Sequence, residues 1–214
     1  MPFLLNKISD AASRLQSVQD WSLAPQIFQR IVTCYGHMEV DLMASTKSRK
    51  AQFFYSWSKA DEQALGLDSL SRDVMWNSWQ LPYLFPPFPL IAACLNKIQE
   101  QAVKKIVMIL PFWPGKPWFS DFLMMAISIK RLPIRKDLVV DLTSGVPPPN
   151  LQTLKLVVAT LSEKNGELEQ HFPLKQGPLW RQVGDKRQRL SMEAPGNSGF
   201  IGQVGLEYHR LPLL

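Results

Sequence analysis

Short apolar runs alternate with amphipathic segments through the first three quarters of the chain. The clearest helical period lies in residues 23–36 (LAPQIFQRIVTCYG), where Pro25 suits a first turn and Gly36 suits a C-terminal cap. The clearest strand is 104–113 (KKIVMILPFW), an apolar run that Pro114 and Gly115 bring to an end. The pattern predicts further strands at 38–45, 52–57, 81–85 and 135–142, and further helices at 1–19, 89–103 and 117–128.

Strands that alternate with helices indicate an α/β fold. We expect a small open, mostly parallel sheet flanked by helices, with a short N-terminal helical segment and a largely irregular C-terminal tail. The runs VDL, KIVMIL and LVVDL are expected to be adjacent central strands. Residues 151–162 fit a helix or a strand equally well. The predicted organisation is 1–37 as helical segments, 38–162 as the α/β unit, and 163–214 as a polar, flexible tail.

Composition narrows the class of protein. The 214 residues contain two cysteines and three histidines, without the spacing of a zinc site or of a disulfide framework. No apolar stretch reaches the roughly 18 residues of a membrane helix, and the N-terminus does not have the pattern of a signal peptide. We therefore expect an intracellular protein, cytoplasmic or nuclear, with no membrane partner and no bound metal.

The net charge of +6 is concentrated in one segment. Residues 97–136 hold eight Lys or Arg against two Asp or Glu, which gives 8 − 2 = +6. Such a basic segment attracts phosphate groups, and we expect weak, non-specific contacts with nucleic acid. The residues expected to make them are Lys104, Lys105, Arg135 and Lys136. The alternative is a solvated rim around buried strands.

The stretch LPYLFPPFPLI (81–91) combines aromatic side chains with four prolines. Proline removes a ladder donor and fixes φ, so Pro86 and Pro87 end a strand there and make a rigid turn. Such a turn is either shaped to hold a ligand or is a structural corner between two core elements.

Seven blocks of the sequence, in order, resemble the polymerase polyprotein of DIRS-type, tyrosine-recombinase-bearing retrotransposons. The blocks are NKISDAASRL, DWSLAPQIFQRI, VDLMAS, LDSLSRDVMW, YLFPPFPLI, KIVMILPFWPGKPWF and RKDLVVDL. The resemblance implies that residues 1–37 contain the end of ribonuclease H, which follows reverse transcriptase in the polyprotein. It implies that Asp10 matches the last carboxylate of a four-carboxylate Mg²⁺ site. The other three acids would precede Met1, so we expect no ribonuclease H activity from this chain.

Residues 38–142 are also similar, more faintly, to phage-type DNA adenine methyltransferases. The element that carries this similarity is Phe85-Pro86-Pro87-Phe88, in place of the family's Asn/Asp-Pro-Pro-Tyr/Phe turn. Phenylalanine cannot accept a hydrogen bond from an adenine amino group, so the polar acceptor is missing. The resemblance implies that Asp41 and Asp68 are candidate ribose or substrate acids. No glycine-rich turn for a cofactor such as S-adenosylmethionine occurs within 38–142.

These observations predict a non-catalytic C-terminal piece of a retrotransposon polymerase polyprotein, which supports nucleic-acid binding beside its upstream reverse transcriptase and ribonuclease H. We expect no cofactor and no enzymatic activity from the isolated chain. Two alternatives stay open. One is a DNA adenine methyltransferase-like protein that uses S-adenosylmethionine, and the other is a nucleic-acid or protein interaction module retained by a host.

Overall fold

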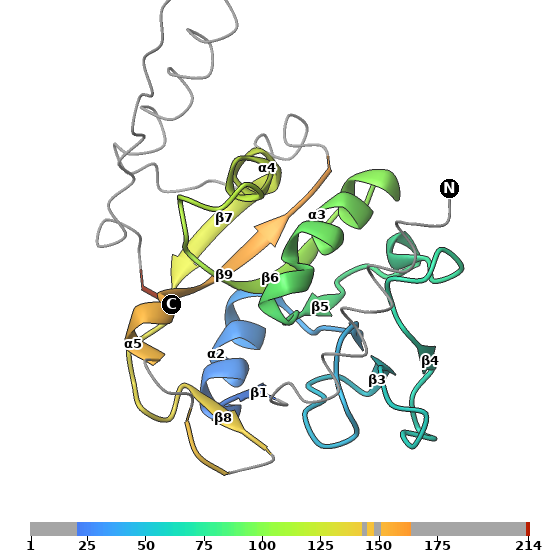
Figure 1. The fold of residues 1–214 in the computed structure, drawn as a ribbon, viewed down its shortest axis with the longest axis horizontal. Helices are drawn as coiled ribbons and strands as arrows, with labels where there is room; N and C mark the ends of the chain where they lie inside the picture. Colours follow the sequence, from blue (N-terminus) through green and yellow to red (C-terminus); the bar gives the residue numbers. More distant parts are fainter. Residues whose placement is uncertain (1–20, 143–144, 148–150, 164–212) are drawn as a thin grey trace, which may run out of the picture.

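The computed structural model describes residues 21–142, 145–147, 151–163 and 213–214. Within these residues a seven-stranded sheet has the order β4-β3-β2-β5-β6-β9-β7 (Figure 1). Its strands are β2 (Val40–Asp41), β3 (Phe53–Ser56), β4 (Gly66–Leu67), β5 (Tyr83–Leu84), β6 (Ile106–Pro111), β7 (Ala126–Arg131) and β9 (Leu156–Leu161). The expected helix at 1–19, with Asp10, and most of the tail from 163 lie outside the described residues.

Five neighbouring strands of the sheet, from β4 to β6, are parallel. Only β9 runs against its neighbours, pairing antiparallel with β6 and with β7. The expected α/β fold with a mostly parallel sheet is therefore confirmed. Residues 151–162 turn out to hold both of the structures considered for them, a short helix α5 (Leu151–Leu154) followed by β9.

The expectation of three adjacent central strands is wrong. The VDL and KIVMIL runs belong to β2 and β6, and β5 lies between them. The LVVDL run forms β8 (Val139–Asp141), which pairs antiparallel with β1 (Trp21–Leu23) in a separate two-stranded sheet. An apolar run indicates only that a strand is buried. Strand β8 is buried because it packs against the main sheet, although it is not part of that sheet. Its sequence therefore looked like that of a central strand.

Helix α2 (Pro25–Tyr35) begins and ends where local signals place it, whereas the helix expected at 89–103 covers only residues 91–100. Helix α2 ends at Gly36, whose amide donates to the Val32 carbonyl with φ at 105°, a region that favours glycine. A 3-10 turn η3 (Phe88–Leu90) leads into α3 (Ile91–Glu100), and a second one, η2 (Trp76–Ser78), precedes β5.

Helix α4 (Phe119–Met125) is shorter than the helix expected at 117–128. The chain passes directly from Met125 into β7, where β-branched Ile127 and Ile129 favour an extended backbone. The hydroxyls of Ser128 on β7 and Thr160 on β9 are hydrogen-bonded across the pair. Residues 126–128 were expected to continue the helix, but their pairing with β9 makes them extended.

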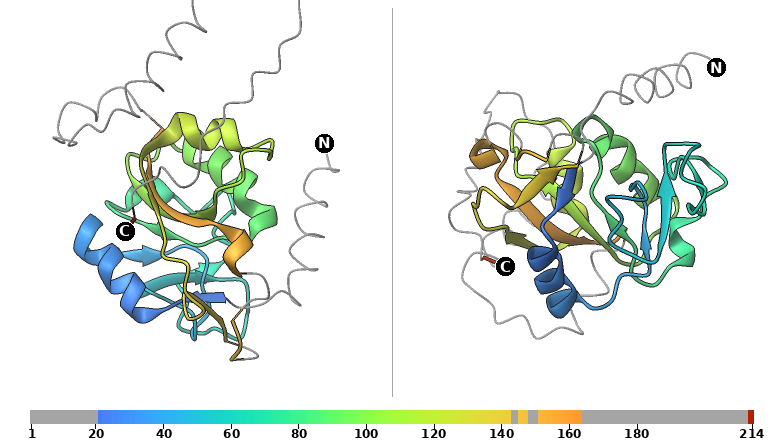
Figure 2. Two further views of the ribbon diagram at one scale, coloured as in Figure 1. Left: turned by 90° about the vertical axis from the view of Figure 1, so that its left-hand side faces the viewer. Right: turned by 90° about the horizontal axis from the view of Figure 1, so that it is seen from below.

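The sheet is the middle layer of three. Helices α3 and α4 cover one face, while α2 and the β1–β8 pair cover the other, as Figure 2 shows with α2 and α3 on opposite sides. Strand β6 divides its side chains accordingly, with Met108 in the first core and Ile109 in the second. Burying each such side chain contributes about 1.5–3 kcal/mol. Because α2 and β6 share the second core, residues 21–37 and 38–162 do not have separate cores.

No helix in the described ranges is both long and apolar enough to cross a membrane.

Candidate nucleic-acid interface

The strand order distinguishes one edge of the sheet, the edge at which other doubly wound sheets bind ligands. Ranked along the chain, the seven strands read 3-2-1-4-5-7-6, so the connections diverge between β2 and β5. In doubly wound sheets, ligands bind beyond the carboxyl ends of the strands at such a switch point, because the loops on either side turn away from each other and leave a crevice. We call the side where β2, β5 and β6 end the carboxyl edge. Asp41 and the Phe85–Phe88 turn, both expected from sequence, lie there.

Asp41 ends β2 and is buried, with 3% of its surface exposed. Its Oδ1 accepts a hydrogen bond from the amide of Met43 at 3.3 Å, and its Oδ2 accepts one from the amide of Lys50 at 3.0 Å. The carboxylate therefore fixes the loop between β2 and β3 to the strand end. Both of its oxygens are engaged with backbone amides, which is a structural role rather than that of a free ribose acid.

The Phe85-Pro86-Pro87-Phe88 turn follows β5 directly. Pro86 is buried, while Phe85 and Phe88 are half-buried and pack against the cores. The Pro87 carbonyl accepts a hydrogen bond from the amide of Leu90 at 2.9 Å, which starts the turn into α3. The turn is thus a rigid corner, as one of the two interpretations of the sequence had it.

Phe88 lies between two tryptophans. Its ring meets Trp21 edge to face with centroids 5.5 Å apart, and it meets Trp113 in the same way at 5.2 Å. Trp113 follows β6, so the three rings come from three separate segments that meet beside the carboxyl edge. We call Trp21, Phe88 and Trp113 the aromatic row. All three residues are half-buried, so part of each remains accessible at the surface.

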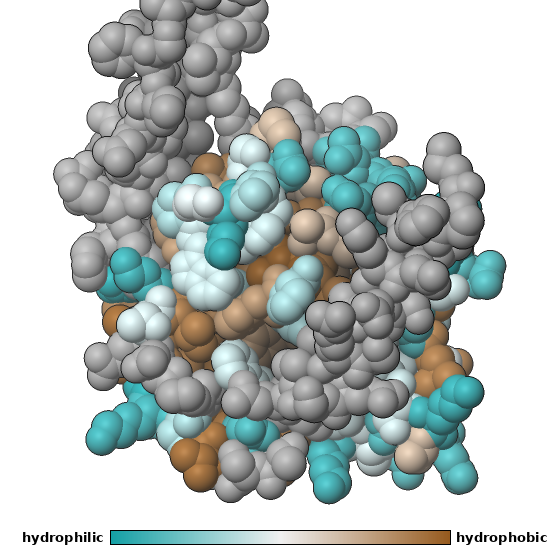
Figure 3. Space-filling view, in the orientation of Figure 1, coloured by the Kyte–Doolittle hydropathy of each residue, from teal (hydrophilic) through white to brown (hydrophobic). Residues whose placement is uncertain are grey.

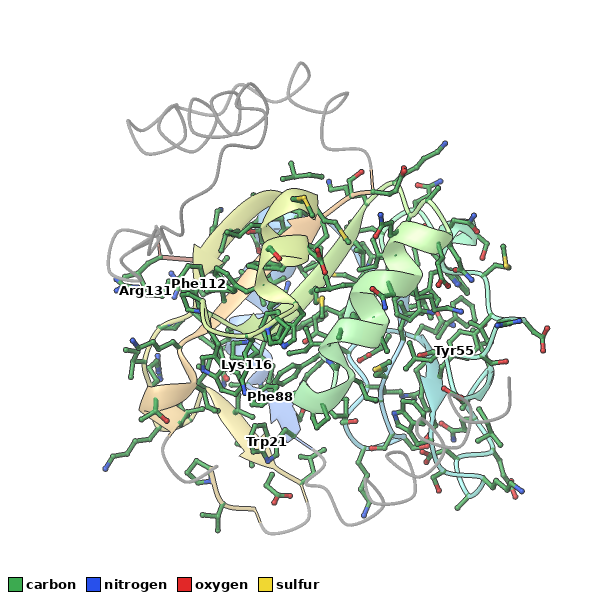
Figure 4. The ribbon with its side chains drawn as sticks, turned by 45° about the horizontal axis from the view of Figure 1, so that its top comes forward. Trp21, Tyr55, Phe88, Phe112, Lys116 and Arg131 are labelled. Atoms are coloured by element: carbon green, nitrogen blue, oxygen red, sulfur yellow. The ribbon has the colours of Figure 1, made fainter. Side chains whose placement is uncertain are left out.

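A lysine completes the aromatic row. The turn Trp113-Pro114-Gly115-Lys116 is closed by the Lys116 amide, which donates to the Trp113 carbonyl at 3.1 Å. The turn returns the side chain over the indole, with the Lys116 Nζ 5.7 Å from the ring centroid of Trp113. Figure 4 shows Trp21, Phe88 and Lys116 following one another on the same side of the molecule. A cation over one ring of such a row suits a base with its phosphate.

The surface is hollowed on this side. Figure 3 shows a depression with an apolar floor near the centre of the face, beside α3 and below α4, rimmed by paler side chains. The indole Nε1 of Trp21 is buried and has no hydrogen-bond partner among the described residues. A buried donor without a hydrogen-bond partner is uncommon in folded proteins.

The four basic residues expected to bind nucleic acid are not brought together. Lys104 and Lys105 precede β6 and lie at its amino end, whereas Arg135 and Lys136 follow β7 and lie on the side of its carboxyl end. The length of a six-residue strand, about 20 Å, separates these two sides. Arg135 is further engaged by an exposed ion pair with Asp137, N to O 2.8 Å.

Three other cations lie at the carboxyl edge. Lys116 follows β6, Arg131 ends β7, and Lys155 precedes β9, whose antiparallel direction brings its start to the same side. Figure 4 shows Arg131 beside Phe112 on the side of Lys116. Sequence reasoning included Lys116 and Arg131 in the basic segment but missed Lys155 and Trp21. The pattern of apolar and polar residues does not predict that Lys155 or Trp21 lies here, because their positions depend on pairing between distant strands.

Asp68 follows β4, and its carboxylate, like that of Asp41, accepts a hydrogen bond from a backbone amide. It has φ at 50° and accepts a hydrogen bond from the amide of Leu70 through Oδ1, at 3.0 Å. Lys97 on α3 donates to the carbonyl of Ser71 at 2.6 Å and ties the same turn to the helix. Burial lowers the pKa of Lys97, while Asp68 acts to raise it. The resulting arrangement fixes the turn against α3.

A polar cluster that sequence reasoning missed joins the loops after β2 and β3. Asp61 accepts hydrogen bonds from the hydroxyls of Ser56 and Thr46. Burial acts to raise the pKa of Asp61, but these hydrogen bonds outweigh it, so that the pKa lies below its ordinary value. Thr46 lies in the loop after β2, Ser56 ends β3 and Asp61 lies in the loop after β3, and only the fold places the three together.

Among the described residues, no group of three or more His, Cys, Asp or Glu has the arrangement of a metal site. No family model matches the chain, and no curated protein is significantly similar to it.

Proposed function

We propose that residues 21–163 form a non-catalytic module of a retrotransposon polymerase polyprotein that contacts single-stranded nucleic acid at its carboxyl edge. The resemblance of the sequence blocks to DIRS-type polyproteins supplies the context, in which reverse transcriptase and ribonuclease H precede this unit. The aromatic row with Lys116 supplies the chemistry.

One observation carries this proposal. Beside the carboxyl edge, next to the switch point between β2 and β5 where ligands of doubly wound sheets bind, the chain presents the half-buried residues Trp21, Phe88 and Trp113 with the ammonium of Lys116. Ring faces stack on any base, and lysine attracts any phosphate, so this chemistry favours binding without sequence preference.

The same residues argue against transfer chemistry at this edge. The position that would accept a hydrogen bond from a base amino group is Phe85, whose side chain has no acceptor. The neighbouring carboxylate, that of Asp41, already accepts from two backbone amides. A general base needs a lone pair within reach of the proton that it removes; the Phe85 side chain has none, and the Asp41 carboxylate is buried and holds the loop between β2 and β3.

Binding of a fluorescently labelled single-stranded oligonucleotide to the full chain, followed by anisotropy, tests the proposal. Trp113→Ala should weaken binding by about 1–3 kcal/mol, the contribution of one stacked base. Trp79→Ala is the matched control, because Trp79 is also half-buried but packs at the far end of the sheet against Phe53. Equal affinities for both variants and the wild type would show that the aromatic row makes no contact.

The second candidate is a methyltransferase that uses S-adenosylmethionine, and the strand order favours it. The 3-2-1-4-5-7-6 order with an antiparallel seventh strand is the one found in S-adenosylmethionine-dependent methyltransferases, and the Pro-Pro turn follows its fourth strand. Fold alone does not determine activity, and the absence of a hydrogen-bond acceptor in the Phe85 side chain is evidence against methyl transfer to a base amino group. Titration calorimetry with S-adenosylmethionine separates the candidates: we expect no saturable heat, and a one-to-one isotherm would favour the methyltransferase.

A further inference from the structure

Strand β7 is one of the two edge strands of the seven-stranded sheet, and residues from the end of the chain lie along its outer side. Strand β9 pairs with one side of β7, and residues Leu213–Leu214 lie along the other. The amide of Leu214 donates to the carbonyl of Arg131 at 3.0 Å, and Leu213 forms a parallel bridge with Arg131. Figure 1 shows the C-terminal end beside the arrowhead of β7.

The direction of the Arg131 carbonyl follows from the sheet itself. The amide of Leu132 donates inward to the carbonyl of Leu156 on the β9 side, at 3.0 Å. Within one planar peptide unit the carbonyl points opposite to the N–H, so the Arg131 carbonyl must point outward, away from β9. Leu214 therefore meets an acceptor that the sheet leaves at its edge, which is how an added strand is held.

The side chains of the two leucines have different surroundings. Leu214 packs against the second hydrophobic core, the one that also contains Leu132 and Val158. Leu213 is 56% exposed. This alternation is that of an extended strand, with one side chain toward the core and the next toward solvent. The contact therefore combines a main-chain hydrogen bond with one apolar side chain.

We propose that the edge of β7 is a strand-addition site for an extended apolar peptide, and that residues 213–214 of this same chain are its occupant. Exposed sheet edges invite pairing with other chains, and proteins commonly cover them. Strand addition takes its affinity from main-chain hydrogen bonds and its specificity from alternate side chains. The Leu214 side chain packs on the core and so provides the specificity, and the Arg131 carbonyl is the main-chain acceptor that points outward.

Among the described residues, the contact with β7 is made by Leu213 and Leu214. In a parallel pair the carbonyl of a residue accepts from the residue after its partner. If this register continued toward Ile129, the next donor would come from position 212. That residue is proline, which has no N–H. Pro212→Ala would supply the missing donor and should strengthen the contact.

The test uses the full chain with two matched substitutions. Leu214→Ser removes the side chain that packs on the core, and Leu213→Ser removes the exposed one. A labelled peptide with the sequence of residues 209–214 (HRLPLL) is titrated against the wild type and both variants. The chain's own segment competes at a high effective concentration, so the peptide should bind the Leu214→Ser chain about tenfold more tightly than the other two.

Backbone amide exchange gives an independent readout. The Leu214 amide should exchange slowly in the wild type and in the Leu213→Ser chain, and at the rate of an unstructured peptide in the Leu214→Ser chain. Equal peptide affinity for all three chains, together with an unprotected amide at position 214, would overturn the proposal. A dimer that Leu214→Ser converts to a monomer would overturn the assignment of the occupant to the same chain, because a second copy would then supply it.

Discussion

The ring of Phe88 meets the ring of Trp113 edge to face, with centroids 5.2 Å apart. This contact joins the turn after β5 to the turn after β6 across the carboxyl edge of the sheet. Phe88 belongs to the corner that shapes the backbone, and Trp113 is the ring on which Lys116 lies. The structural corner and the candidate binding surface are therefore one unit.

Phe88→Ala should destabilise the fold by about 2–4 kcal/mol, because it removes a half-buried ring and two edge-to-face pairs of about 0.5–1.5 kcal/mol each. Urea unfolding measures the change. A double-mutant cycle with Trp113→Ala should give a coupling of about 0.5–1.5 kcal/mol. Pro89→Ala, at the neighbouring exposed position, should change stability by less than about 0.5 kcal/mol. A Phe88→Ala chain as stable as the wild type would contradict the role of the turn as a structural corner.

Asp41→Asn should destabilise the fold by about 1–3 kcal/mol. Asparagine has one acceptor oxygen, whereas Asp41 accepts one amide hydrogen bond on each oxygen, so one buried N–H would face an NH₂ group. Asp68→Asn is the matched control, since Asp68 uses one oxygen and has a left-handed φ that asparagine adopts readily. Thermal unfolding should show a lower midpoint for the first variant only. The opposite order would point to a different role for Asp41.

The pKa of Asp61 predicts a loss of stability in acid. Its folded-state pKa lies below the ordinary value of 3.8, so the folded state favours the ionised carboxylate. The stabilisation is fully present above the unfolded pKa and is lost as the pH falls through the folded pKa. Unfolding free energies measured from pH 6 down to about pH 2 should decrease less steeply for Asp61→Asn than for the wild type, around and below pH 4. Parallel curves for the two chains would rule out this contribution.

Local signals in the sequence were sufficient for several elements. Pro25 and Gly36 predicted both ends of α2, and the run from Ile106 to Pro111 predicted β6, because these signals act within a few residues. Pairing between distant residues was not predictable in this way. The same kind of apolar run forms β6 within the main sheet and β8 outside it, and only the partner strands distinguish the two.

The candidate site was predictable in part for the same reason. The Pro86–Pro87 turn depends only on adjacent residues, so its position at the end of a strand was predicted correctly. Asp41 was predicted as a possible ligand acid. Its hydrogen-bond donor is the backbone amide of Lys50, nine residues away, and a backbone contact cannot be predicted from the type of residue. The contact of Trp21 with Phe88 spans 67 positions of the chain and depends on the β1–β8 pair.

The salt dependence of single-stranded nucleic-acid binding tests the central claim most directly. Each phosphate contact contributes about −0.7 to the slope of log affinity against log salt, so contacts from Lys116, Arg131 and Lys155 predict a slope of about −2. Lys116→Gln with Lys155→Gln should reduce the slope to about −0.7, whereas Lys104→Gln with Lys105→Gln, at the opposite edge, should leave it near −2. A slope that changes equally in both double variants, or no binding at about 0.1 M salt, would contradict a nucleic-acid interface at the carboxyl edge.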